Sequence, residues 1–133
     1  MIIIGHRGAK GLAPENTRAS LQKGLEAGAD QVEFDVRVTK DGRPILNHDP
    51  FILGKDSHPY LITHHTYAEL RKQKPDLTTL DEALDTVNKK VPIIIEVKPH
   101  VPTGPVIEII KDRIRRGWPP TDIYISSFSQ PIL

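Results

Sequence analysis

The sequence contains no cysteine, so disulfide bonds, thiolate nucleophiles and cysteine-ligated zinc are all excluded. Any metal ion must therefore be held by carboxylates, imidazoles, carbonyl groups or water. The net charge is only +1, which gives no reason to expect a nucleic-acid partner. There is no signal-peptide pattern at the N-terminus and no apolar run of membrane-spanning length. We therefore expect a cytoplasmic protein without a membrane span.

What is present is the composition of an ordinary globular protein, 38% hydrophobic and 26% charged, in a chain long enough for one domain. Short apolar strands alternate with capped helices. Helices are expected to begin near residues 17, 66, 79 and 105. Five strands are predicted, at 2–4, 31–38, 44–47, 92–97 and 122–127. Apolar strands separated by helices favour a parallel α/β sheet, either open or closed into a barrel, with 2–4 as a buried strand.

The strand 31–38 carries the strongest polar pattern. Alternate residues of a strand share a face, so Glu33, Asp35 and Arg37 lie together opposite an apolar face. On spacing alone, a solvated charged face explains this pattern equally well. The neighbouring strands favour a site instead.

Three other predicted strands also end in ionisable residues. The first ends in His6-Arg7, the third in His48-Asp49, and the fourth carries Glu96 and Lys98 on one face. In parallel α/β folds, active sites are built at the carboxyl ends of the strands. One shared site is therefore a simpler explanation than four independent strand ends.

The carboxylates and cations of this set suit a metal-assisted reaction on an anionic group. Glu33, Asp35 and Glu96 offer the oxygen ligands that Mg²⁺ and Ca²⁺ prefer. Arg7 and Lys98 bring positive charge that can hold an anion beside the metal. The sequence therefore favours a phosphoryl group as the reacting centre.

Two histidines complete the set, because His6 and His48 can move protons near neutral pH. Each residue also has a structural interpretation. His6 could be hydrogen-bonded to a loop, and Arg7 could form a structural ion pair. Glu96 and Lys98 could pair with each other. The segment after His48 could be a simple turn. His58, His64 and His65 lie in a polar loop and are expected to be solvated.

Seven motifs in order resemble the glycerophosphodiester phosphodiesterase family. They are His6-Arg7-Gly8, Pro14-Glu15-Asn16-Thr17, Glu33-Phe34-Asp35-Val36, Thr39-Lys40-Asp41-Gly42, His48-Asp49, Glu96-Val97-Lys98 and Ser126-Ser127-Phe128. The resemblance implies a TIM-type (β/α) barrel. It also implies hydrolysis of a small-molecule glycerophosphodiester to glycerol 3-phosphate and an alcohol.

The resemblance further implies roles for individual residues. A divalent cation, Mg²⁺ or Ca²⁺, is bound by the family residues that match Glu33, Asp35 and Glu96. The general acid and base match His6 and His48, without a distinction between them.

The phosphate faces the family residues that match Arg7 and Lys98. Glu15 belongs to a motif expected to order its loop and to support the site from behind. Asn16 of the same motif is as easily interpreted as a helix cap.

The chain also departs from the family pattern. The segment 51–74 is short and lacks an Arg-Thr-Thr cluster common in the family, and only the first five barrel strands are expected. A barrel of this type takes about 250 residues. We therefore expect a single partial barrel domain over 1–133 with a short insertion at about 50–75.

Three architectures follow from that length. The barrel is completed by the rest of a longer chain, or by a second copy in a homo-oligomer, or the sheet stays open. Two alternative functions stay open as well: a truncated barrel fragment that binds metal or phosphate without catalysis, and a related phosphodiesterase acting on another lipid-derived diester.

Overall fold

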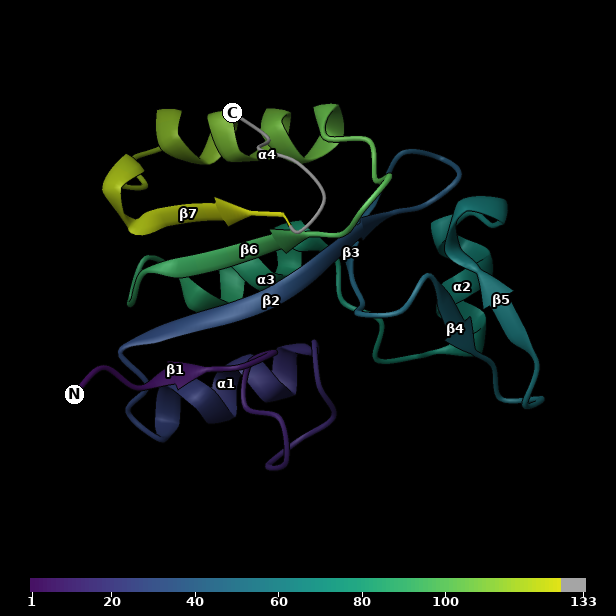
Figure 1. Cartoon of the computed structure of the whole chain (residues 1–133), viewed down its shortest axis with the longest axis horizontal. Helices are drawn as coiled ribbons and strands as arrows, with labels where there is room; N and C mark the ends of the chain where they lie inside the picture. The colour runs from purple at the N-terminus through teal and green to yellow at the C-terminus, as the bar shows by residue number, and fades with distance from the viewer. Residues whose placement is uncertain (128–133) are drawn as a thin grey trace.

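The centre of the molecule is one mostly parallel sheet, seen in a computed structural model that describes residues 1–127 (Figure 1). The strand order is β1-β2-β6-β7, with β3 beside β2. The strands are β1 (Ile4–Gly5), β2 (Gln31–Val38), β3 (Pro44–Leu46), β6 (Ile93–Val97) and β7 (Ile123–Ser126). β1, β2, β6 and β7 run parallel, which confirms the predicted parallel α/β sheet. Phe128 of the last sequence motif lies outside the described residues.

The third strand is the exception, because β3 runs antiparallel to β2. Val36 pairs with Leu46 and Val38 with Pro44. The loop 39–43 between the two strands is too short for the crossover that a parallel connection needs. The prediction of five parallel strands is therefore wrong in this strand, and residues 1–127 contain four parallel strands.

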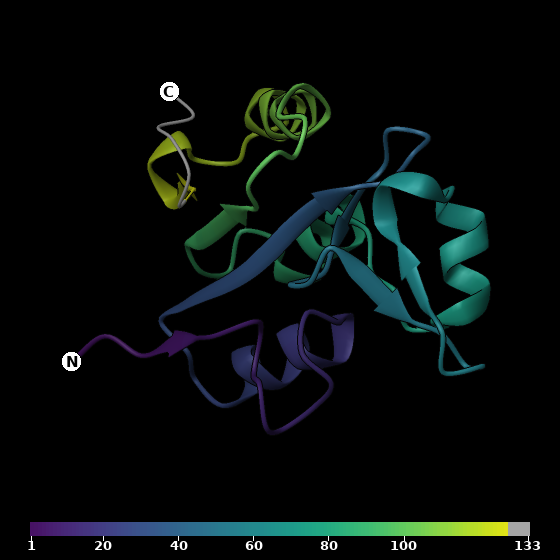
Figure 2. The same ribbon diagram turned by 45° about the vertical axis from the view of Figure 1, so that its right-hand side comes forward.

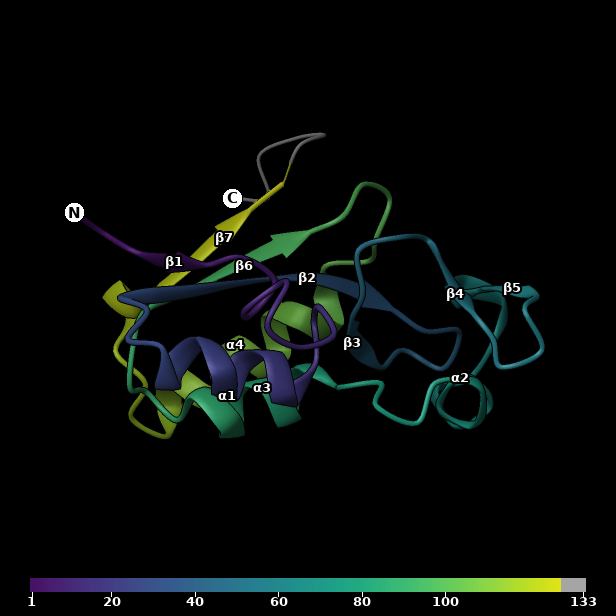
Figure 3. The same ribbon diagram turned by 90° about the horizontal axis from the view of Figure 1, so that it is seen from below.

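Three helices cover one face of the sheet, as Figure 3 shows from below. They are α1 (Arg18–Glu26), α3 (Leu80–Val87) and α4 (Gly104–Arg115). The side chain of Thr17 caps the start of α1. Thr79 caps α3 as part of a capping box. Apolar side chains of β2 and β6 pack against these helices in the main core: Val32, Phe34, Val36, Ile93, Ile95, Leu21, Leu80, Leu84, Val106 and Trp118.

The first strand is not buried as predicted. Ile2, Ile3 and Ile4 are 67%, 52% and 48% exposed. Gly5 pairs with Val32, whose side chain packs on the helices, so the alternation along β1 turns Ile4 to the opposite face. Within the part of the chain that the structure describes, β1 is also an edge strand, because β2 is its one strand partner. An apolar run at a sheet edge therefore does not guarantee burial.

The segment after His48 forms a small lobe beside the sheet, the teal elements in Figure 2. It contains a hairpin of β4 (Phe51–Leu53) and β5 (Pro59–Leu61), followed by helix α2 (Tyr67–Gln73). Thr66 caps α2 with the predicted capping box. The sequence does not predict the hairpin, because each strand has only three residues between polar loops. The lobe has its own core of Ile45, Ile52, Ile62, Leu70 and Leu77.

Within residues 1–127, each helix is either too short or too polar to cross a membrane.

Candidate active site

The site lies where one edge of β2 is left free by other strands. β1 pairs with residues 31–32 and β3 with 36–38, while β6 occupies the opposite edge. Between them, loops bind the β2 backbone directly. Gly8 N donates to Glu33 O at 3.0 Å, and Asn47 N donates to Asp35 O at 3.1 Å. The loops after β1 and β3 therefore converge on the same short stretch of β2.

Three carboxylates meet on the sheet face opposite the helices. Asp35 on β2 is in register with Glu96 on β6, and Glu33 lies one side-chain repeat earlier. One oxygen from each of the three lies within 4.8 Å of the others. Glu33 and Asp35 are only 8% and 1% exposed. The structure thus brings together the three predicted metal ligands.

The state of these oxygens fits a divalent cation. Glu33 Oε1 is buried and accepts no hydrogen bond from the described residues. A buried carboxylate oxygen without a donor is costly, and oxygen-rich clusters of this kind suit Mg²⁺ or Ca²⁺. The donor set therefore matches the expected cofactor.

The pKa values of the three carboxyl groups also fit a cation site. Burial, followed by the charge of Asp35, raises the pKa of Glu33 to about 7. Burial, followed by a hydrogen bond with Asp35, also raises the pKa of Glu96. Burial alone would raise the pKa of Asp35, but hydrogen bonds with Glu96, Asn16 and Lys98 outweigh it and lower that pKa. Carboxyl groups this close hold protons unless a cation neutralises them.

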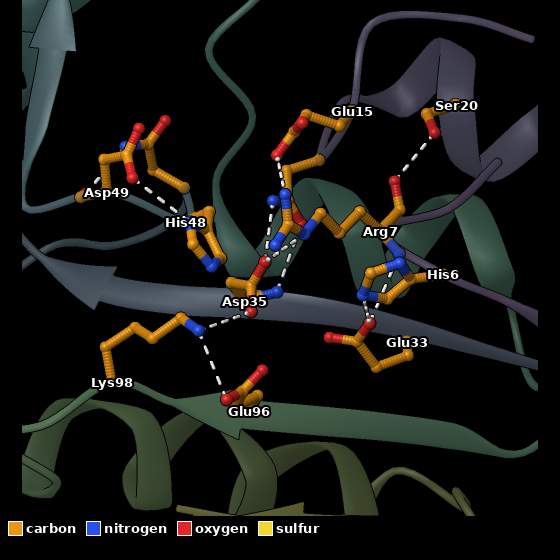
Figure 4. A network of polar contacts seen from close by, with 12 residues as sticks. His6, Arg7, Glu15, Ser20, Glu33, Asp35, His48, Asp49, Glu96 and Lys98 are labelled. Atoms are coloured by element: carbon orange, nitrogen blue, oxygen red, sulfur yellow. Dashed lines mark hydrogen bonds and ion pairs between the residues drawn. The ribbon is translucent and has the colours of Figure 1, made fainter. Parts of the chain in front are cut away.

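Two cations border the triad (Figure 4). Lys98 Nζ lies 3.1 Å from Asp35 Oδ1 and 3.2 Å from Glu96 Oε1, and Lys98 is only 7% exposed. Arg7 Nε lies 3.3 Å from Asp35 Oδ2, and its Nη1 donates to Glu15 Oε2 at 2.8 Å. The structure therefore holds Glu15 behind Arg7, on the side away from Asp35.

Arg7 is also fixed through its backbone. Its φ of 52° lies in the left-handed region, which costs free energy for a residue with a side chain. Its N–H points at Glu33 Oε2 over 3.3 Å, and its carbonyl accepts from Ser20 Oγ at 2.7 Å. Gly8 follows with φ of 86°, and a Cβ there would lie 2.4 Å from Ser20 Oγ. The loop and α1 are therefore packed too closely for any other residue.

The two histidines lie on different sides of the triad. His6 Nε2 is 3.4 Å from Glu33 Oε2, and its side chain is 61% exposed. In Figure 4, His48 lies beyond Asp35 as seen from His6. His48 Nδ1 lies 3.1 Å from Asp49 Oδ1. Although β3 is antiparallel, it pairs with only the last residues of β2, so His48 stays near the carboxyl ends of the parallel strands.

Sequence reasoning missed the roles of Asn16, Arg37 and Ser20. Asn16 does not cap α1: its amide donates to Asp35 Oδ2 at 3.0 Å and accepts from Asp35 N at 3.1 Å. Arg37 donates to the His48 carbonyl through Nε at 3.0 Å and Nη2 at 2.8 Å. Asn16 belongs to one of the family motifs, and Arg37 lies on the polar face of β2, so sequence features pointed to both residues. No sequence feature pointed to Ser20.

A cavity of about 450 Å³ opens between this site and the small lobe. Most of its lining is polar, with Arg7, Glu15, Asn16, Asn47, His48, Asp49 and Lys74. Its apolar lining comes from Phe51, Ile52 and Leu53 of β4. A small molecule in this cavity would lie beside Arg7 and His48.

The fold and the site together define a barrel-type α/β protein with an acidic, cation-flanked cluster at the carboxyl edge of its sheet. The chain belongs to the glycerophosphoryl diester phosphodiesterase family, whose sequence model matches residues 6–133. A glycerophosphodiester phosphodiesterase of Bacillus altitudinis is 31% identical over 140 residues, covering 95% of this chain and 57% of that protein. Human glycerophosphodiester phosphodiesterase 1 is 32% identical over 111 residues, covering 73% and 34%.

Solved structures of glycerophosphodiester phosphodiesterases also match this fold. The glycerophosphodiester phosphodiesterase of Thermotoga maritima matches with a TM-score of 0.80 at 30% identity, covering 97% of this chain and 55% of that one. An Oleispira antarctica phosphodiesterase in complex with the product sn-glycerol-3-phosphate matches with a TM-score of 0.77 at 29% identity, covering 97% and 58%. The expected fold class is confirmed, because this sheet matches part of the TIM-type barrels of the family. The chain spans about half the length of these relatives.

Proposed function

We propose that this chain carries the catalytic residues of a metal-dependent phosphodiesterase that hydrolyses glycerophosphodiesters to glycerol 3-phosphate and an alcohol. The observation that carries the proposal is the buried triad of Glu33, Asp35 and Glu96 within 4.8 Å, with Lys98 at its border. The family membership and the product held by the Oleispira relative support it.

The triad residues would hold a divalent cation, Mg²⁺ or Ca²⁺. Such an ion supplies Lewis-acid stabilisation of the charge that develops on phosphate oxygens. The buried Glu33 Oε1, which accepts no hydrogen bond from the described residues, is the oxygen best placed to become a ligand.

Arg7 and Lys98 bind the phosphate from opposite sides of Asp35. Both already lie within 3.3 Å of that carboxylate, Arg7 at Oδ2 and Lys98 at Oδ1. Glu15 orients the Arg7 guanidinium through its other end. Because these groups are fixed before substrate arrives, little reorganisation is needed when charge develops.

His6 and His48 serve as the acid/base pair. One imidazole removes a proton from the attacking oxygen, and the other gives a proton to the oxygen of the leaving alcohol. Asp49 accepts from His48 Nδ1, which leaves Nε2 to exchange the proton. Arg37 fixes the backbone of His48 through two hydrogen bonds to its carbonyl.

We further propose that residues 1–133 form one partial barrel domain with an insertion at about 50–75. In this arrangement the small lobe of β4, β5 and α2 is the insertion, with its separate core. The partner of the site is a small-molecule glycerophosphodiester.

The test is the release of glycerol 3-phosphate from glycerophosphocholine, with Mg²⁺ or Ca²⁺ titrated into the purified chain. His48→Ala is expected to lower kcat by about 10²–10⁴-fold, the usual contribution of a general acid or base. Glu96→Gln is expected to lose activity because the triad loses a ligand. Glu108→Gln, on the exposed surface of α4, is the matched control and should behave as wild type.

A folded chain that releases no product at any concentration of either cation would refute the proposal. Cation binding by that inactive chain would then favour the alternative, a fragment that binds metal without catalysis.

A further inference from the structure

The cavity between the sheet and the small lobe carries one cation that the proposed reaction does not use. Lys74 lies in the cavity lining together with Arg7 and His48. It is half-buried, whereas Lys72 on α2 is exposed and lies outside the lining. Lys74 is also the last residue of the segment 51–74, in which the chain departs from the family pattern. Membership of the family therefore does not decide what Lys74 binds.

The other charged groups of the lining are already paired. Arg7 Nη1 donates to Glu15 Oε2 at 2.8 Å. His48 Nδ1 lies 3.1 Å from Asp49 Oδ1. The ammonium group of Lys74 forms no ion pair and no hydrogen bond with any of residues 1–127. The cavity therefore carries one positive charge that no described residue neutralises.

The two amide side chains of the lining are also engaged. Asn16 exchanges two hydrogen bonds with Asp35, at 3.0 and 3.1 Å. The Asn47 amide donates to two backbone carbonyls, at 2.8 and 3.1 Å. Within the described part of the chain, Lys74 is therefore the polar side chain of the lining that has no partner of its own.

The lobe fixes the backbone of Lys74. Its N–H donates to the Leu70 carbonyl at 2.9 Å, and its carbonyl accepts from Leu77 N at 3.0 Å. Leu70 and Leu77 are both buried in the core of the lobe. A lysine packs its methylene stem on apolar surface and keeps its ammonium group at the polar end, and Phe51 and Leu53 supply apolar surface to the same lining. Only the side chain of Lys74 must therefore be ordered when a ligand binds.

We propose that Lys74 binds a second anionic group of the substrate, carried on the alcohol part of the glycerophosphodiester. This inference rests on the proposed function and specifies its substrate class. Arg7 binds the diester phosphate, and Lys74 binds a carboxylate or a phosphate on the alcohol, since an ammonium group acts on both as a point charge. With serine as the alcohol, water adds to phosphorus, the bond from phosphorus to the serine oxygen breaks, and that oxygen leaves with a proton. The products are glycerol 3-phosphate and serine.

The test compares kcat/KM for glycerophosphoserine and glycerophosphoethanolamine, which differ by a single carboxylate. Wild type is expected to favour the serine diester by about three- to tenfold, between the contribution of an exposed ion pair and that of a charged hydrogen bond. Lys74→Gln should bring the ratio of the two kcat/KM values close to one, and Lys74→Arg should keep the preference. Lys72→Gln is the matched control, because it removes the same charge two residues away, outside the cavity lining.

A second pair of substrates, glycerophosphoinositol and its 4-phosphate, tests a phosphate in place of the carboxylate. A preference in either pair that Lys74→Gln removes and Lys72→Gln retains would support the proposal and identify the anion. Turnover without a preference in either pair would overturn it and leave the proposed function intact. An equal loss of preference in Lys74→Gln and Lys72→Gln would also overturn it, because the overall charge of the protein would then explain the selectivity.

If none of these substrates is turned over, the proposed function fails, and calorimetry with Ca²⁺ present still decides the role of Lys74. Glycerophosphoserine is expected to bind wild type about three- to tenfold more tightly than glycerophosphoethanolamine, and Lys74→Gln should remove the difference. Equal affinities of wild type for the two ligands would overturn the proposal.

Discussion

Asp35 differs from its two neighbours in the number of donors that surround it. Asn16 and Arg7 approach one carboxylate oxygen, and Lys98 approaches the other. Hydrogen bonds with Glu96, Asn16 and Lys98 keep the pKa of Asp35 low against the effect of burial, whereas burial raises the pKa of Glu33 and Glu96. One carboxylate of the triad is thus held ionised, and the other two exchange protons for a cation as conditions change.

Replacing Asn16 is expected to destabilise the protein through Asp35. Asn16→Gly keeps the backbone free to adopt the observed φ of 57° but removes both hydrogen bonds to Asp35. We expect the free energy of unfolding to fall by about 1–3 kcal/mol, because the buried Asp35 loses its partners. Asn16→Ala should cost about 1–2 kcal/mol more, since alanine is strained at positive φ. Urea unfolding of the three proteins measures both steps, and equal stability of Asn16→Gly and wild type would contradict the assigned contacts.

The raised pKa of Glu33 predicts a particular pH dependence of stability in EDTA. The folded protein holds the Glu33 proton up to a pKa of about 7, while the unfolded chain releases it near the ordinary value of 4.5. Folding therefore takes up a proton between these values, so the stabilising contribution of protonated Glu33 is full below pH 4.5 and is lost as pH rises through 7. Glu33→Gln mimics the protonated form and should lack this loss.

The measurement is urea unfolding of wild type and Glu33→Gln at pH 5, 6, 7 and 8. The difference in the free energy of unfolding should shift in favour of the variant as pH rises. A difference that stays constant, or that moves toward wild type with rising pH, would show that Glu33 titrates normally.

At the scale of elements, the short hairpin from β2 to β3 decides where His48 lies. β3 has only three residues and pairs with the last residues of β2. The chain therefore leaves β3 while it is still close to the carboxyl ends of the parallel strands. A longer antiparallel strand would carry His48 to the opposite edge of the sheet. The same short return starts β4 at residue 51, next to the cavity.

Helix α3 supports this region through its capping box. Thr79 Oγ1 accepts from Glu82 N at 3.1 Å, and Glu82 Oε1 accepts from Thr79 N at 3.0 Å. Thr79→Ala is expected to lower the free energy of unfolding by about 1 kcal/mol, while Thr79→Ser keeps the oxygen and most of the stability. Chemical denaturation of the pair provides the comparison. Equal losses in both variants would show that the Thr79 methyl group, and not the cap, supplies the stability.

At the scale of the whole molecule, the sheet is covered on one face and carries the triad on the other. Leu21, Leu84 and Phe34 are fully buried between the helices and the sheet. Tyr124, aligned with Ile94 on the triad face, is 52% exposed. Stability therefore comes mainly from the helical side, and the triad face gains most from ligands.

A divalent cation is expected to stabilise the whole fold. Binding to the folded state alone at one hundred times Kd contributes about 2.7 kcal/mol, which shifts the Tm of a domain of this size upward by about 8–16 °C. Thermal melts with Ca²⁺ or Mg²⁺ against EDTA measure the shift. Glu96→Gln should abolish it, and Glu108→Gln should retain it. An equal shift in both variants would place the cation elsewhere.

How much of this could be predicted depends on the range of the interactions. Capping boxes at Thr66 and Thr79 act over three residues, so local spacing was enough to locate both helices. The residues of the triad were identified because strand periodicity and the family motifs coincide on Glu33 and Asp35. Tertiary structure then brought Glu96 into register beside them.

The remaining features depend on contacts that sequence spacing does not encode. The antiparallel direction of β3 follows from how its short strand pairs with β2, and the exposure of Ile4 follows from which face of β1 meets the helices. Asn16 became a support of Asp35 because β1 and β3 leave that part of β2 without a strand. The sequence alone thus determined the family, the helix starts and the types of residue in the site. Only the tertiary structure decided which donors meet which carboxylate, because those pairs are set by packing across distant segments.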